Sequence, residues 1–191
     1  MAGRGKSIKE AKLEPIYIAE AYHEDVYGGL RAILEAHHKI HEGDLWNLEM
    51  YSGSVSDNGS IILAGIMPAG YEQHFTIAGA CGGDATLELI EGCDFSASGT
   101  AVLPHNMNRR VGDSGAMDCY ENPTITGGTV LQKMFLPGGS GPRAGGSHIG
   151  TREGLEWVTN PGESYAVRLT NVSGGGQDCW LGINFYHEAV T

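Results

Sequence analysis

From residue 44 onward the sequence is a series of short apolar runs, each ended by glycine, proline, asparagine or aspartate. In the run LWNLEMYS at 45–52, Trp46, Leu48 and Met50 alternate with Asn47, Glu49 and Tyr51, as in a strand with one apolar face. The sequence Asp57-Asn58-Gly59 then gives a strong turn signal, because asparagine and glycine tolerate positive φ. This punctuation, with no helical interlude, predicts an all-β fold.

The expected strands occupy 45–52, 60–67, 74–81, 85–92, 99–105, 116–122, 128–139, 155–160, 165–172 and 179–188. Many short strands separated by turn signals are typical of a sandwich or a jelly roll. We therefore expect residues 44–191 to form a jelly-roll-like antiparallel β-sandwich, and 191 residues suffice for one such domain with a proper core. The glycine-rich stretch at 138–154 interrupts the rhythm and is expected to be a long loop.

Residues 1–43 differ from the rest of the chain. At 30–43 the apolar and histidine residues recur with helical spacing, but alternate residues also fit a strand, so periodicity leaves both structures open. The first twelve residues hold a third of the positive charge of the chain, against one carboxylate, Glu10. We interpret them as a cationic arm for an acidic partner, with a solvated terminus as the alternative. Its basic residues are Arg4, Lys6, Lys9 and Lys12.

Charge and composition exclude several classes of partner. The formal net charge is −11 with only 12 lysines and arginines, so the chain should repel a nucleic-acid backbone. No run approaches about 18 apolar residues and the first residues lack the apolar core of a secretory signal, so no membrane partner is expected. The four cysteines form no C-x-x-C pair and are expected to be reduced and mostly buried, with one disulfide as the less favoured alternative.

The run HHKIHEG at 37–43 has the densest cluster of metal-ligand side chains. His37 and His41 could share a zinc ion on a helix, but no nearby motif supplies a third ligand. A cupin-type site would need two histidines one residue apart in a strand, and this spacing is different. Ser147-His148 is a poor nucleophilic pair, because neighbours on an extended chain point apart. We expect no catalytic residue, no metal and no cofactor; the alternative is a cupin-like metalloenzyme using His37, His38 and His41.

The run LPHNMNRRVGD at 103–113 gathers amides and two adjacent arginines between expected strands. Asn106 and Asn108 alternate with their neighbours, so both amides can face one way and bond exposed backbone across a subunit contact. Arg109 or Arg110 can pair with a carboxylate of a neighbouring subunit, since planar guanidinium groups suit partly buried ion pairs. We therefore interpret these four residues as a subunit interface.

Several segments resemble a family of small tailed-bacteriophage virion proteins. They are GTAVLPHNMNRR, ENPTITGGTVL and the C-terminal EWVTNPGESYAVRLTNVSGGGQDCWLGINFYHE, with HKIHEGDLWNLEMYS and ACGGDATLELIEG nearer the start. The resemblance covers roughly residues 37–188 and consists of turn and strand patterns. Asn106, Asn108 and Arg109 match the Asn-x-Asn-Arg turn of that family, to which no catalytic role is attached.

The resemblance implies a non-enzymatic virion structural protein: a head decoration, or cement, protein that binds the major capsid protein as a trimer. It also implies assembly in the host cytoplasm and a final place on the capsid exterior, with the N-terminal segment in the shell contact. Because HKIHEG leads into the first strand in that family, we favour extended chain there, so that residues 1–43 form an extended N-terminal arm. The nearest alternative is a tail or fibre component that binds a host glycan through exposed aromatics such as Trp157 or Trp180.

Overall fold

The computed structural model describes residues 35–97, 99–112, 115, 117–138, 147–150 and 156–189. The chain divides into two units, Met1–His38 and Lys39–Thr191, and the strands all belong to the second unit. The basic residues of the predicted arm lie outside the described residues.

Helix α1 (Glu35–Glu42) precedes the first strand. Gly43 has a φ of 87°, its N–H bonds Ile40 O at 3.2 Å, and the N–H of Asp44 bonds Lys39 O at 2.9 Å. These two bonds form a Schellman cap, which needs a residue in the left-handed region and therefore favours glycine. The preference for extended chain over 30–43 is thus wrong for Glu35–Glu42, and the helical spacing in that run was the correct signal.

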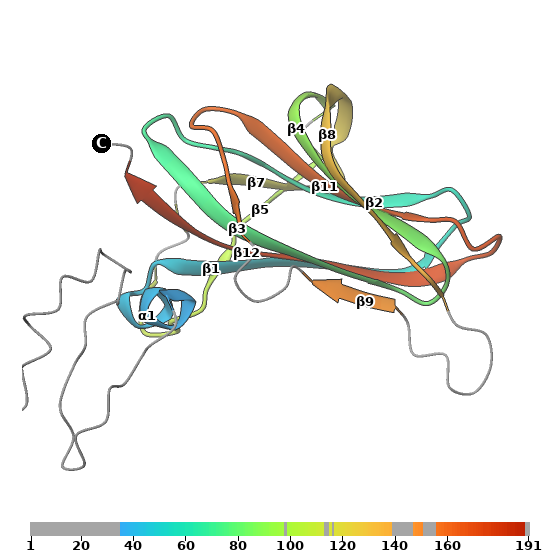
Figure 1. Ribbon diagram of the computed structural model, residues 1–191, viewed down its shortest axis with the longest axis horizontal. Helices are drawn as coiled ribbons and strands as arrows, with labels where there is room; N and C mark the ends of the chain where they lie inside the picture. Colours follow the sequence, from blue (N-terminus) through green and yellow to red (C-terminus); the bar gives the residue numbers. More distant parts are fainter. Residues whose placement is uncertain are drawn as a thin grey trace, which may run out of the picture. The chain divides into compact units, whose positions relative to one another are not determined.

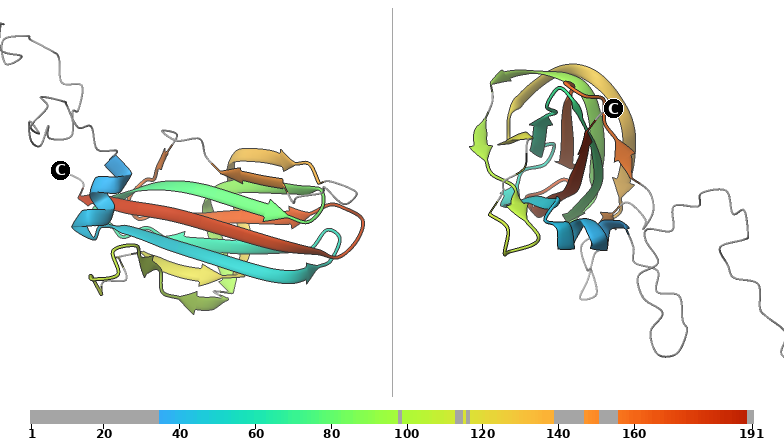
Figure 2. Two further views of the ribbon diagram at one scale, coloured as in Figure 1. Left: turned by 90° about the horizontal axis from the view of Figure 1, so that it is seen from below. Right: turned by 90° about the vertical axis from the view of Figure 1, so that its left-hand side faces the viewer.

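In the described part of the chain, two six-stranded antiparallel sheets pack face to face, so the predicted β-sandwich is confirmed (Figure 1). The first sheet has the order β10-β3-β12-β1-β6, and β9 also pairs with β3. The second has the order β5-β7-β2-β11-β4-β8. Figure 2 shows the same two layers from below and from one end. The strands are β1 (Leu45–Val55), β2 (Ser60–Ile66), β3 (Tyr71–Cys81), β4 (Ala85–Ala97), β5 (Thr100–Val102), β6 (His105–Asn106), β7 (Asp118–Glu121), β8 (Thr124–Leu136), β9 (Ser147–Gly150), β10 (Trp157–Val158), β11 (Ser164–Asn171) and β12 (Gln177–Ala189).

Most strands match their predicted positions, with two instructive differences. The predicted strand at 99–105 divides into β5 and β6, which pair with different sheets. The predicted loop at 138–154 contains β9, which pairs with β3. The turn at 57–59 is confirmed, with Asn58 at a φ of 59° and the N–H of Gly59 bonded to Ser56 O at 2.9 Å.

The core lies between the sheets and follows from the two-residue period of the strands, which sends alternate side chains to opposite faces. From Gln73 to Cys81 in β3 the odd-numbered residues are buried and the even-numbered ones are more exposed. The largest buried apolar side chains are Trp46, Leu63, Ile77, Leu87, Leu89, Leu136, Leu169, Leu181 and Phe185. All four cysteines are buried, as predicted, and burial raises the pKa of Cys119 and of Cys179 to about 12, so these thiols stay protonated.

Two fully buried amides differ in how they are satisfied. The Asn171 side chain donates to Val55 O at 2.7 Å and to Gly175 O at 2.6 Å, and accepts from the N–H of Ser173 at 3.0 Å. It therefore ties the end of β1 to the turn between β11 and β12. The Gln73 side chain faces the core, and neither its Nε2 nor its Oε1 has a hydrogen-bond partner in the described part of the chain.

These amides should respond oppositely to mutation. Asn171→Ala removes the side-chain donor to the buried Val55 O and the acceptor of the Ser173 N–H, so we expect a loss of about 2 kcal/mol in the free energy of unfolding. Gln73→Met keeps the volume and removes an unsatisfied amide, so we expect no loss and up to about 1 kcal/mol of gain. Urea unfolding of both variants measures the difference. Equal destabilisation by the two substitutions would contradict the contrast.

Candidate functional site

The predicted interface run lies at the edge of the sandwich where the first sheet ends in β6 and the second in β5. Strand β6 pairs with β1 in the first sheet, whereas β5 and β7 extend the second sheet beyond β2. The loop at 103–112 connects these additions. Its position at the rim of both sheets leaves one side of the loop toward solvent.

Within this loop the asparagines bond backbone of their own chain. Asn106 is only 2% exposed; its Nδ2 donates to Gly43 O at 2.6 Å and its Oδ1 accepts from the N–H of Asn108 at 2.8 Å. Asn108 donates to His41 O at 3.1 Å and accepts from the N–H of Arg110 at 3.2 Å. Both asparagine side chains therefore bond irregular backbone, as expected, but the bonds shown are within one chain. They hold the loop against the junction between α1 and β1.

The same loop presents other side chains to solvent. Leu103 is 75% exposed and Met107 is 42% exposed. Arg109 and Arg110 are also exposed, and Arg109 reaches back to Asn106 O at 3.5 Å. The fixed loop thus displays two apolar side chains beside two guanidinium groups.

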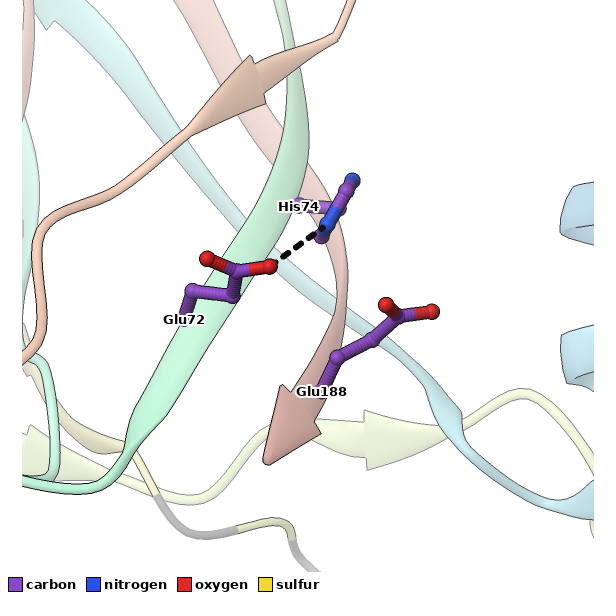
Figure 3. Close-up of side chains that lie close together, drawn as sticks. All are labelled: Glu72, His74 and Glu188. Carbon is purple, nitrogen blue, oxygen red and sulfur yellow. Dashed lines mark ion pairs between the residues drawn. The ribbon is translucent and has the colours of Figure 1, made fainter. Parts of the chain in front are cut away.

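A second gathering of side chains lies on the outer face of the first sheet (Figure 3). Glu72 and His74 come from β3 and Glu188 from β12, and one ligand atom from each lies within 4.8 Å of the others. Residues 72 and 74 share a face because they are two apart on a strand, and Glu188 is the direct cross-strand partner of Glu72. We call Glu72, His74 and Glu188 the histidine–carboxylate cluster.

Neighbouring groups orient this cluster. His74 Nδ1 lies 3.3 Å from Oε2 of Glu156, which also accepts a hydrogen bond of 2.8 Å from the Tyr186 hydroxyl. The Tyr186 ring stacks on His74 with 4.7 Å between centroids. Lys39 Nζ lies 3.5 Å from Oε1 of Glu188. Imidazole and carboxylate groups together can bind a divalent metal ion.

Of the three histidines that the sequence singled out, the side chain of His37 lies outside the described part of the chain, and the other two do not join this cluster. His38 and His41 lie on α1 and belong to no converging group of metal-ligand side chains among the described residues, where the one such group is the histidine–carboxylate cluster. Sequence reasoning considered two histidines one residue apart and passed over Glu72-x-His74, which has the same alternating spacing. The third ligand could not be anticipated, because only the pairing of β3 with β12 brings Glu188 close.

A third group of charged side chains, around Glu88, has its charges paired within the group. Glu88 on the second sheet is buried; its Oε2 accepts from Nη2 of Arg168 at 2.6 Å and its Oε1 lies 2.8 Å from Lys133 Nζ. Burial alone would raise the pKa of Glu88, but the hydrogen bonds from Lys133 and Arg168 outweigh it and hold that pKa below its ordinary value of 4.5. This triad satisfies its charges internally and suits a structural role.

The aromatic residues of the glycan-binding alternative are strand residues. Trp157 lies in β10 and donates its indole N–H to Oε1 of Gln132 at 3.1 Å, while Trp180 lies in β12 and donates to Oε2 of Glu49 at 3.4 Å. Both are half-buried rather than displayed on an exposed loop.

When the chain is compared with known proteins, no protein-family model and no curated protein sequence matches it. Among the described residues, no helix is long and apolar enough to cross a membrane.

Glu88→Gln should lower stability in a pH-dependent way. The lowered pKa means that ionised Glu88 stabilises the fold above its unfolded-state pKa, and that this contribution is lost as pH falls through the folded-state pKa, below 4.5. We expect Glu88→Gln to cost about 1.5–3 kcal/mol at pH 7, with the difference from wild type shrinking below pH 4.5. Urea unfolding at pH 7 and at pH 3 measures the difference in the free energy of unfolding between Glu88→Gln and wild type, with Glu121→Gln as the control. A difference that does not depend on pH would argue against the ion triad.

Proposed function

We propose that this protein is a non-enzymatic structural component of a bacteriophage virion, a head decoration protein that binds the major capsid protein as a trimer on the capsid exterior. The resemblance of residues 37–188 to small virion proteins supports the phage assignment. The exposed loop at 103–110 supports the binding role and is the observation on which the proposal rests.

The strand order supports the finer description of the sandwich as a jelly roll. Strands β1 to β4 alternate between the two sheets, and the last two strands then insert between earlier ones. Strand β12 lies between β1 and β3 in the first sheet, and β11 lies between β2 and β4 in the second. This wrapped order is the one expected of a jelly roll, an architecture that viral capsid domains use.

The loop at 103–110 has the properties of a preformed binding surface. Methionine and arginine are enriched at protein interfaces, and a contiguous exposed apolar patch often marks one. Because Asn106 and Asn108 already fix the backbone, the loop loses little conformational entropy when a partner binds. The exposed Leu103 and Met107 would supply apolar area, while Arg109 and Arg110 would select a carboxylate-bearing partner surface in a neighbouring subunit.

Substitutions in this loop should weaken self-association. We expect wild-type protein to scatter light with three times the monomer mass of 20.3 kDa, and both Leu103→Ser with Met107→Ser and Arg109→Ala with Arg110→Ala to shift the mass toward the monomer. Val158→Ser, which changes a 54% exposed apolar residue on β10, is the matched control and should leave the mass unchanged. A loop variant with the wild-type mass would remove the basis for this interface.

The basic residues before residue 20 should contribute to attachment rather than to folding. Deleting residues 1–20 removes no described strand, so the sandwich should stay folded while co-sedimentation with undecorated capsids is lost. Substituting Arg4, Lys6, Lys9 and Lys12 with glutamine should have the same effect, whereas exchanging only the three lysines for arginine should preserve binding. Wild-type co-sedimentation of the deletion would refute the arm as the attachment segment.

A further inference from the structure

The imidazole of His74 lies between two carboxylates, with Nδ1 toward Glu156 and Nε2 toward Glu72. A carboxylate only accepts hydrogen bonds, so Nδ1 at 3.3 Å from Glu156 Oε2 carries the proton. In the neutral ring Nε2 then carries a lone pair. This atom is buried and has no hydrogen-bond partner in the described part of the chain, and Oε1 of Glu72 lies 3.8 Å away.

A neutral Nε2 beside Glu72, with Glu188 in the same cluster, places three electron-pair donors close together, an arrangement that a bound cation stabilises. Glu72 and Glu188 are direct cross-strand partners, so the register of β3 and β12 holds their backbone positions opposite each other. Lys39 Nζ lies 3.5 Å from Glu188 Oε1 but is also 3.9 Å from Glu42 Oε2, so it is shared. Because Lys39 is shared with Glu42, its positive charge offsets the charge of Glu188 only in part.

We propose that Glu72, His74 and Glu188 bind a divalent transition-metal ion, with Zn²⁺ as the ion of best fit. Nitrogen and oxygen ligands bind Zn²⁺ at about 2.0–2.2 Å. Ligand atoms within 4.8 Å of one another can reach such distances by small rotations of Glu72 and Glu188, whose side chains are 38% and 45% exposed. The bound ion would join the start of β3 to the end of β12.

The surroundings of His74 match those of a metal-ligating histidine. Such a histidine almost always donates its second ring N–H to a carboxylate, which fixes the tautomer and the ring orientation. Glu156 occupies that position, and the Tyr186 hydroxyl donates to the same oxygen of Glu156. Because the site lies on the outer face of the sheet, it differs from a cupin-type centre inside the barrel.

Isothermal titration of the full-length, chelator-treated protein with Zn²⁺ tests the site. We expect His74→Gln and Glu72→Gln each to weaken one binding event at least tenfold, and Glu156→Gln to weaken it by about 10- to 100-fold. Lys39→Met should tighten binding, because it removes the competing cation from Glu188. His105→Gln, an exposed histidine outside the cluster, is the matched control and should bind as wild type does.

Circular dichroism and thermal unfolding confirm that each variant is folded, and Zn²⁺ should raise the midpoint of wild type but not of His74→Gln. Titration with Ca²⁺, which prefers oxygen ligands, should give weaker binding than Zn²⁺. The proposal fails if wild type binds no Zn²⁺, if the cluster variants bind it as wild type does, or if His41→Gln rather than His74→Gln abolishes binding.

Discussion

Strand β12 fixes the register of the first sheet, because it pairs with both β1 and β3 over most of its length. A slip of one residue would turn Leu181, Ile183 and Phe185 out of the core, so burial of these side chains selects a single alignment. That alignment also sets the polar outer face, where it places Glu188 opposite Glu72 and Tyr186 opposite His74. The core therefore determines the geometry of the histidine–carboxylate cluster, although none of its three residues belongs to the core.

The fold could be predicted from the sequence where the signal was local. Alternation in 45–52 and the turn at Asn58 each depend on neighbouring residues, and both predictions are confirmed. The helix at Glu35–Glu42 is not the structure we favoured, because its residues fit either period; the local signal that distinguishes the two is Gly43 after a basic last turn, which is typical of a helix end. Strand β9 was missed because a glycine-rich run gives little strand propensity, and its pairing with β3 depends on residues far away in the sequence.

The candidate sites were harder to predict for the same reason. Asn106 and Asn108 were recognised as groups that satisfy irregular backbone, yet their acceptors, Gly43 O and His41 O, are reached only because β6 pairs with β1. In the cluster, Glu72 and His74 show alternate spacing in the sequence, whereas Glu188 joins them only through strand pairing. Residue type and spacing thus indicate which side chains can act, and the sheet topology decides which of them meet.

The segment from Lys39 to Gly43 connects both candidate sites. Lys39 Nζ contacts Glu188 and lies 5.5 Å from the centroid of the Tyr186 ring, at the edge of the histidine–carboxylate cluster. The carbonyls of His41 and Gly43 accept from Asn108 and Asn106, which hold the loop at 103–112. This short segment, which leads into β1, is therefore bonded to both candidate sites. A metal ion bound at Glu188, as we propose, would compete with Lys39 for that carboxylate, and so would act on the same segment that holds the loop at 103–112.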